Sequence, residues 1–245
     1  MSNTATITPR YDGEAGAEAA GEAAAAFVAA IASLAATLAA TDAERAVIAR
    51  CRAMARQDRL AGTRVDLRLA ANGDLLGAAT SLGFVDAGGH ARVRLEAGRP
   101  VELTDKGGTA ILLQRTGDRL AILSPGGAAV VDRVIARTVE QRAERHLTRV
   151  SGSKVIRRTL ANGETELVAR EALPGTGGAG RVAVRVGRGG VAHADISCVA
   201  GTRCEDMLKD MAEAIGGTVQ NRGLKDDYYD DPSAAAALPH VRAGG

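Results

Sequence analysis

The most informative stretch of this sequence is RVAVRVGRGGVAHADISCVAGTRCEDMLKDMAEAIGG, which spans residues 181–217. Apolar residues alternate through 182–186, as in a half-buried strand, and Gly189-Gly190 supplies a turn before a second alternating run. Thr202-Arg203-Cys204-Glu205 is a capping box, which predicts a helix that begins here and ends at the double glycine closing the stretch. These signals predict a small ββα module.

The residues on either side of this module suggest how the rest of the chain is organised. The stretch immediately before it, Leu173–Gly180, has the glycine-rich composition of a linker. Near the start of the chain, Thr4–Thr8 alternates enough to add a short edge strand to an otherwise acidic lead-in. The expected parts are a flexible lead-in over 1–21, an α+β domain over 22–172, a Gly-rich linker over 173–180, the small ββα module over 181–231 and a disordered tail over 232–245.

Strand patterns dominate the first part of the larger domain. A capping box at Thr41–Glu44 begins a helix, and alternation over Val65–Leu69 is followed by a tight turn at Asn72-Gly73. The alternation of apolar and polar residues that is typical of strands continues at Val93–Leu95 and at Val101–Leu103.

The second part of the larger domain combines a helix with two hairpins. Hairpins are expected over 111–123 and 155–169, and a helix is expected to open at Ser124-Pro125. The inner face of this helix would carry Val131, Val134, Ile135 and Thr138. The connections are too short for crossover helices, so the strands are antiparallel. The predicted fold class is therefore α+β: an antiparallel sheet with packed helices, followed by the small ββα module.

Composition limits the partners of the chain. The formal net charge of +2 is too small by itself to indicate a nucleic-acid or membrane partner. Three cysteines, an odd number, favour a reducing compartment over a disulfide framework, so we expect a cytoplasmic protein. The uncharged run Ala23–Ala40 approaches the length of a membrane span, but its large residues form a narrow stripe and its flank is acidic, which favours a helix outside the membrane.

Thiol chemistry is one candidate function. His193, Asp195, Cys198 and Cys204 lie within twelve residues, but their spacing lacks the paired ligands of zinc sites, and no metal is expected. Cys204 is predicted in the first turn of a helix beside Arg203, where the helix dipole and the positive charge favour the thiolate. Cys204 is therefore a candidate reactive thiol with Cys198 as its resolving partner. The alternative is a small side chain packed at the start of a helix.

A basic stretch is the second candidate. Residues 128–158 contain eight basic and three acidic residues. The candidate interaction patch comprises Arg133, Arg137, Arg145, Arg149, Arg157 and Arg158. Such a patch suits phosphates or an acidic protein surface, and the stretch has no aromatic residue to stack on a base. Nucleic acid is therefore the weaker partner, and a solvated helix face without any partner is the alternative.

The sequence contains no recognisable catalytic motif. No nucleophile has a base motif around it, and Glu140 and Glu144 lie one turn apart beside arginines, which suits surface ion pairs better than acid–base catalysis. Gly175–Gly180 spells a dinucleotide fingerprint, but the residues after it alternate as a strand where that motif needs a helix. We therefore expect no enzyme activity and no cofactor.

The motifs of the ββα module also occur together in a known family. They are Gly189-Gly190, Gly201-Thr202-Arg203-Cys204, the helix with Met207, Leu208, Met211 and Ile215, then Gly216-Gly217 and Lys225–Tyr229. In these features residues 181–229 resemble the small bacterial domain of unknown function 2997. The resemblance covers about a fifth of the chain.

The longer part of the chain resembles a second family. Residues 4–170 follow the order of an early helix, antiparallel strands, one long helix and a final hairpin. This order is similar to domain of unknown function 1257, the family of a conserved plastid and cyanobacterial reading frame, although Thr138–Gln141 stands where that family has aromatic residues.

The two resemblances together imply a partner. Proteins of the two types are often encoded together near an AAA-type ATPase, so the resemblance implies a fusion that acts as a non-catalytic accessory or adaptor protein with such an ATPase. The alternatives are a thiol-based redox or metal-handling protein that uses Cys198 and Cys204, and nucleic-acid binding through the basic patch over 133–158.

Overall fold

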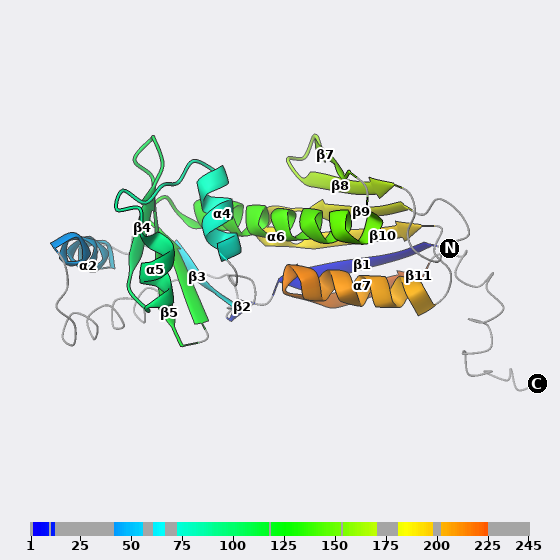
Figure 1. The fold of residues 1–245 in the computed structure, drawn as a ribbon, viewed down its shortest axis with the longest axis horizontal. Helices are drawn as coiled ribbons and strands as arrows, with labels where there is room; N and C mark the ends of the chain where they lie inside the picture. The colour runs from blue at the N-terminus through cyan, green and yellow to red at the C-terminus, as the bar shows by residue number, and fades with distance from the viewer. Residues whose placement is uncertain are drawn as a thin grey trace, which may run out of the picture. The chain divides into compact units, whose positions relative to one another are not determined.

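The computed structural model describes residues 2–9, 11–12, 42–55, 61–66, 73–117, 119–152, 154–170, 181–197 and 202–224. The helices are α2 (Asp42–Ala55), α4 (Asp74–Ser81), α5 (Ala91–Glu96), α6 (Ala128–Ser151), α7 (Thr202–Ile215) and the short 3-10 turn η2 (Arg188–Gly190). The strands are β1 (Ser2–Pro9), β2 (Tyr11–Asp12), β3 (Ala61–Asp66), β4 (Val101–Thr104), β5 (Ala110–Thr116), β6 (Arg119–Ser124), β7 (Ile156–Thr159), β8 (Thr165–Arg170), β9 (Arg181–Val186), β10 (Ala192–Ser197) and β11 (Gly217–Leu224). The strands pair antiparallel and helices pack on them, so the fold is α+β, as predicted (Figure 1).

Several predicted parts lie outside the described residues: the run Ala23–Ala40, the linker over 173–180, the tail over 232–245 and Cys198. Among the helices of the described part, none combines the length and the apolar character needed to cross a bilayer.

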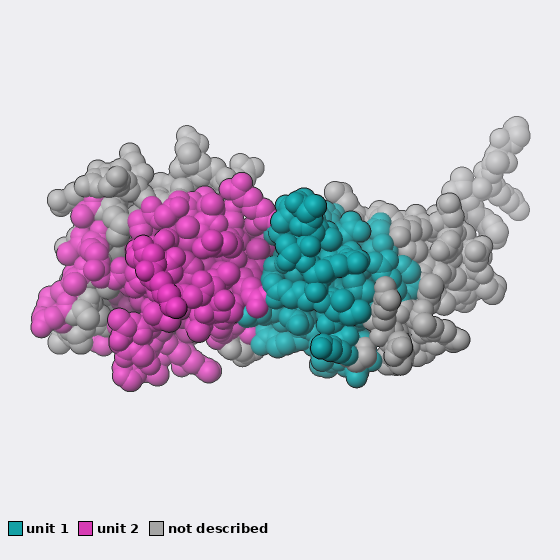
Figure 2. All heavy atoms as spheres, turned by 90° about the horizontal axis from the view of Figure 1, so that it is seen from above, with its two compact units in different colours: residues 1–9, 139–187, 191–245 teal, residues 10–138, 188–190 magenta. Residues whose placement is uncertain are grey.

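The chain divides into two compact units, which Figure 2 colours separately. Unit 1 comprises residues 1–9, 139–187 and 191–245, and unit 2 comprises residues 10–138 and 188–190. This division differs from the boundaries expected from the sequence, because each unit is assembled from segments that are distant along the chain.

Unit 1 is built on a six-stranded sheet with the order β11-β1-β10-β9-β8-β7. β1 lies in the interior of this sheet, with Thr6 opposite His193 of β10 on one side and opposite Gln220 of β11 on the other. Ala5 and Ile7 of β1 are buried, at 4% and 0% exposure. The strand predicted at Thr4–Thr8 is therefore confirmed as part of β1. Its predicted position at an edge, in an otherwise flexible lead-in, is wrong for residues 2–9, because β1 pairs on both sides and completes the core of the sheet.

One face of this sheet is covered by the second half of α6 and by α7 (Figure 1). Because successive side chains of a strand point to opposite faces, Val182, Val184 and Val186 of β9 share one face, and all three are buried. The helices bury their own apolar stripes, which comprise Val139, Ala143 and Leu147 of α6 and Leu208, Met211 and Ile215 of α7. Burial of each large apolar side chain contributes about 1.5–3 kcal/mol, so this interface stabilises unit 1.

The linker predicted at 173–180 does not separate two domains. β8 before it and β9 after it are hydrogen-bonded neighbours from Thr165 opposite Val186 to Arg170 opposite Arg181. The predicted strands, helix and helix end of the ββα module are confirmed, but the module shares its sheet with β1, β7 and β8. Linker composition here marks a connection between neighbouring strands. The polar stretch after the helix forms a further strand, β11, which sequence reasoning missed.

Unit 2 is built on a five-stranded sheet with the order β2-β3-β6-β5-β4. The predicted hairpin over 111–123 is confirmed as β5 and β6, and the inner face predicted for the following helix is buried in α6. α6 begins at Ala128, later than the predicted Ser124-Pro125. The Ser124 hydroxyl is used elsewhere, because it donates a 2.8 Å hydrogen bond to the Ala110 carbonyl and accepts one from the Gly126 amide.

Two predicted strand segments of unit 2 are helical. Gly73, expected in a hairpin turn, has a φ of +73° and is the N-cap of α4. Val93 and Leu95, expected in a strand, lie in α5, where Val93 is 67% exposed and Arg92 forms a 2.9 Å ion pair with Glu96 one turn later. The alternation of apolar and polar residues in this short segment therefore does not reflect a buried strand face. For this reason the alternation predicted a strand where the structure has a helix.

Candidate functional site

A row of polar residues crosses the sheet of unit 1. The turn of the β7–β8 hairpin is closed by hydrogen bonds from the Leu160 amide to the Glu164 carbonyl (2.8 Å) and from the Gly163 amide to the Leu160 carbonyl (2.9 Å). The resulting register places Arg158 directly opposite Glu166. The β8–β9 register places Glu166 opposite Arg185, so the three side chains lie side by side on one face.

The same row continues into the other half of the sheet. His193 of β10 is opposite Arg185, and Thr6 of β1 is opposite His193. The Thr6 hydroxyl oxygen lies 3.2 Å from Nδ1 of His193, whose side chain is exposed. Since Val184 and Val186 face the helices, this row occupies the opposite face of the sheet.

Glu166 is the centre of a cluster of guanidinium groups. Its side chain is only 2% exposed; one carboxylate oxygen pairs with Arg158, and the other lies 3.2 Å from Nε of Arg185 and 4.0 Å from the guanidinium of Arg181. The three arginine side chains are 56%, 52% and 41% exposed, in the order Arg158, Arg185, Arg181. We call Arg158, Arg181, Arg185 and Glu166 the arginine cluster.

The arginine cluster carries an excess of positive charge. Burial alone raises the pKa of Glu166, but the hydrogen bonds and positive charges of Arg158 and Arg185 outweigh burial and hold that pKa below its usual value. The carboxylate is therefore ionised at neutral pH and lies among three guanidinium groups, with Asp195 of β10 on the same face of the sheet. Nε of Arg181 is buried and has no hydrogen-bond partner. Because this atom is buried, only the exposed parts of the three arginine side chains can contact a further anionic group.

The two strand arginines of the basic patch predicted from the sequence do not share one surface. Arg157 and Arg158 point to opposite faces of β7, because consecutive strand residues alternate. Arg157 lies 2.5 Å from Glu140 of α6, whose side chain is 10% exposed, whereas Arg158 belongs to the arginine cluster. The grouping of these two arginines in one patch is therefore wrong.

The four helical arginines of the predicted patch, Arg133, Arg137, Arg145 and Arg149, all lie on the one helix α6, so their grouping stays a prediction. Arg133 and Arg137 belong to unit 2, where Nε of Arg137 donates a 2.9 Å hydrogen bond to the Ser81 hydroxyl. Arg145 and Arg149 belong to unit 1, where both side chains are exposed.

The candidate thiols are described only in part. Cys204 lies in the first turn of α7, as the capping box predicted, and its side chain and the whole of Cys198 lie outside the described residues. His193 and Asp195 share one strand and one face of β10. No group of three histidine, cysteine, aspartate or glutamate residues suited to a metal ion is found in the described part of the chain. The reactive thiol stays a prediction.

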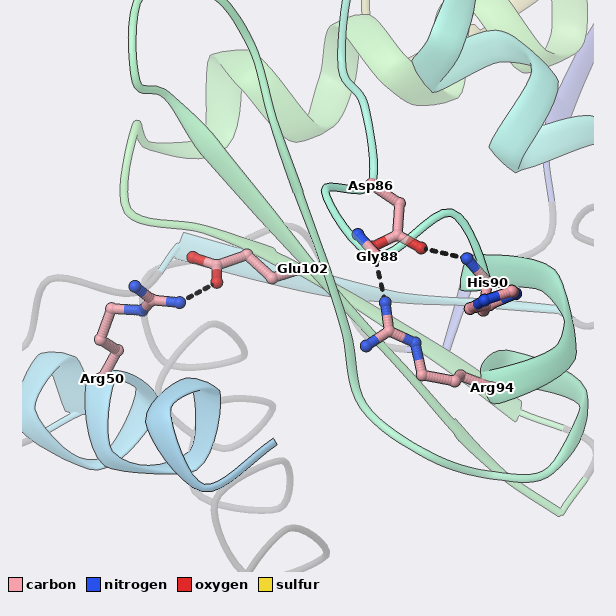
Figure 3. A network of polar contacts seen from close by, with 6 residues as sticks. All are labelled: Arg50, Asp86, Gly88, His90, Arg94 and Glu102. Atoms are coloured by element: carbon pink, nitrogen blue, oxygen red, sulfur yellow. Dashed lines mark hydrogen bonds and ion pairs between the residues drawn. The ribbon is translucent and has the colours of Figure 1, made fainter. Parts of the chain in front are cut away.

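Unit 2 contains a second polar network, around Asp86 (Figure 3). The Asp86 carboxylate accepts hydrogen bonds from the amides of Gly88 (3.1 Å) and His90 (2.8 Å) and from Arg94 (2.6 Å). Burial raises the pKa of Asp86, and these hydrogen bonds together outweigh it, so the pKa lies below its ordinary value.

A second loop of unit 2 has the same sequence pattern and the same contacts. In DKGGT, as in DAGGH, the aspartate accepts hydrogen bonds from the amides two and four residues later, here Gly107 (2.9 Å) and Thr109 (2.8 Å). The two loops flank the bridge between Val85 and Thr104. On the other side of Figure 3, Arg50 of α2 pairs with Glu102 of β4. These carboxylates are occupied by the protein's own donors, so the network fixes loops and is structural.

His146 makes the stability of unit 1 depend on pH. Burial lowers the pKa of His146, and the charge of Arg149 lowers it further against the opposing effect of Asp210. Arg149 lies 3.2 Å from Nδ1 of His146, which must accept this hydrogen bond, so the neutral ring is the native form. The unfolded state therefore binds more protons, and stability falls as the pH decreases below the ordinary pKa of 6.5.

We expect His146→Gln to remove this dependence. The free energy of unfolding of the wild type, measured in urea at pH 7.5 and at pH 5.5, should decrease more between the two than that of the variant. Equal decreases for the two proteins would show that the pKa of His146 is the same in the folded and unfolded states.

The sequence predicted the hairpin that carries part of the arginine cluster, but not its register. A two-residue turn at Asn162-Gly163 would place Arg158 opposite Leu167, whereas in the structure Leu160 pairs with Glu164 and Arg158 lies opposite Glu166. Arg181 and Arg185 could not be added, because their position depends on the pairing of β8 with β9.

Comparison of the chain with protein-family models, with curated proteins and with solved structures gives no match. The resemblance to the two domain families therefore stays a prediction.

Proposed function

We propose that this protein is a non-catalytic adaptor that binds an acidic surface of a partner protein through the arginine cluster. The observation that carries the proposal is the arrangement of three half-exposed guanidinium groups around one buried, ionised carboxylate. Glu166 holds Arg158 and Arg185 in place, so less side-chain entropy is lost when a partner binds them. Guanidinium groups fixed in this way match the geometry of carboxylates, which they can bind through two parallel hydrogen bonds.

The size of the cluster favours a protein partner over a nucleic acid. Three arginines offset by one glutamate can neutralise only a few phosphates, whereas proteins that hold nucleic acid by charge typically make about 6–10 phosphate contacts. The row that continues from the cluster contains His193 and Thr6 and no large aromatic side chain on which a base could stack. A few surface carboxylates of a protein are the better complement.

The identity of the partner is proposed from the resemblance. If residues 4–170 and 181–229 correspond to the two domain families, the partner is an AAA-type ATPase, as that resemblance implies. The first part contributes β8 and the second part β9 to the same sheet of unit 1, which is consistent with a fusion of two proteins that act together.

We expect charge reversal of the cluster to abolish capture of the partner. Tagged protein and the triple variant Arg158→Glu, Arg181→Glu, Arg185→Glu would be compared by native pull-down from the source cells and mass spectrometry. Because like charges across an interface cost several kcal/mol, the variant should lower the affinity of an acidic partner by at least about 100-fold.

A matched control reverses the charge of three exposed side chains outside the cluster, through Arg92→Glu, Lys106→Glu and Lys209→Glu. This control changes the net charge by the same amount and should retain the partner. Near-stoichiometric recovery of an ATPase by the wild type and the control, and not by the cluster variant, supports the proposal. Equal recovery by all three proteins would contradict it, and circular dichroism would establish that each variant is folded.

A further inference from the structure

The edge strand β7 is the most exposed strand in the described part of unit 1. It ends the sheet beside β8, and all four of its residues, Ile156–Thr159, are exposed. Ile156 is 50% exposed, which is unusual for a large apolar residue of a strand. An edge strand presents backbone groups that can pair with another chain.

The hairpin geometry identifies which backbone groups of β7 are available. Leu160 donates its amide hydrogen to Glu164 of the neighbouring chain segment. Because alternate residues of a strand bond the same neighbour, Arg158 and Ile156 bond β8, whereas Arg157 and Thr159 direct their N–H and C=O groups away from the sheet. These two residues offer an incoming strand four backbone hydrogen bonds.

Charge selects the strand that can bind there. β7 and the neighbouring strands carry the cations Lys154, Arg157, Arg158, Arg181 and Arg185 against the carboxylates Glu140, Glu164, Glu166 and Asp195, so the positive charge is concentrated at β7 itself. A second copy of β7 would bring arginines against arginines, which is destabilising. An extended segment rich in carboxylates would instead place one acidic residue beside Arg158, at the edge of the arginine cluster.

We infer that the acidic partner is captured as an extended strand that adds to the sheet beside β7. The inference rests on the proposed function and specifies the form in which the partner binds: main-chain hydrogen bonds supply affinity, and alternate side chains supply specificity. An antiparallel strand with the order Thr-Glu-Glu-Val fits the charge and the polarity of the β7 positions that it would face, which are Thr159, Arg158, Arg157 and Ile156 in that order.

The probe is a peptide of eight residues, Thr-Val-Thr-Glu-Glu-Val-Thr-Val, with blocked termini, titrated into the full-length protein labelled with ¹⁵N. Two isomers of the peptide carry N-methyl groups on alternate residues, one isomer along each edge of the strand. All three peptides have the same charge. Strand addition requires that only one of the two methylated isomers loses binding, because only one edge of the peptide faces β7.

The protein supplies an independent readout. At a free peptide concentration of nine times the dissociation constant, amide hydrogen exchange at Arg157 and Thr159 should slow by about tenfold. Exchange at Ile156 and Arg158, whose amides already bond β8, should change much less. The Arg158→Glu variant should weaken binding of the unmodified peptide by about tenfold or more.

The outcomes separate this inference from the proposed function. If both methylated isomers bind as well as the unmodified peptide, and Arg158→Glu still weakens binding, the cluster binds acidic groups and strand addition is wrong. If no peptide binds and exchange at β7 is unchanged, the inference is also overturned, and the pull-down with charge-reversed cluster decides the proposed function by itself.

Discussion

Replacing Phe84 with alanine should lower the free energy of unfolding by about 3–5 kcal/mol. Phe84 is completely buried and is the largest of the fully buried side chains in the described part of the chain. Its position is fixed by the end of α4, because the Phe84 amide donates a 3.0 Å hydrogen bond to the Ala79 carbonyl. The surrounding core consists of Leu, Ile, Val and Ala, whose fixed rotamers cannot fill the volume of a lost ring.

The next residue along the chain provides the control. Val85 is 58% exposed and makes its bridge to Thr104 through the backbone, so Val85→Ala should change the free energy of unfolding by less than about 0.5 kcal/mol. Urea unfolding followed by circular dichroism would measure both variants against the wild type. Similar, small effects of the two substitutions would mean that the Phe84 ring is not part of a packed core.

Local sequence signals predicted local structure well. The hairpins β5–β6 and β7–β8 and the helices α2 and α7 depend on turn residues and capping boxes that lie within a few residues of one another. The inner face of α6 was predicted for the same reason, since Val131, Val134 and Ile135 recur at helical spacing.

Pairing between distant segments could not be predicted from such signals. β1 is the first element of the chain, yet its Thr6 lies opposite His193 of β10, 187 residues later, and opposite Gln220 of β11, later still. The glycine-rich stretch at 173–180 indicated a boundary, because composition does not reveal that the strands on either side of it pair with each other. The arginine cluster depends on the same pairing, which explains why the sequence indicated Arg158 without Arg181 and Arg185.

β11 was not predicted from the sequence for a different reason. Its sequence, GTVQNRGL, has little apolar content and begins with glycine, so neither periodicity nor strand propensity identifies it. The strand forms because it pairs along β1 and because α7 packs against it. The glycine that weakens the sequence signal is itself required by the structure, since it lies where two backbones approach closely.

Gly217→Ala should lower the free energy of unfolding by about 3 kcal/mol, because the new methyl group has no space. A Cβ atom at this position would lie 2.8 Å from the Thr8 carbonyl oxygen and 2.8 Å from Cγ2 of Ile7. The carbonyl belongs to the backbone of β1, so relief requires β1 and β11 to move apart. Gly163→Ala is the control, because Gly163 has a φ of +84° and no atom within 4 Å of the added Cβ, which leaves only a conformational cost of about 1 kcal/mol. Urea unfolding of both variants would measure the difference. If Gly217→Ala is no more destabilising than Gly163→Ala, then β1 does not lie against β11 at this distance, and the position of the first strand inside the sheet is wrong.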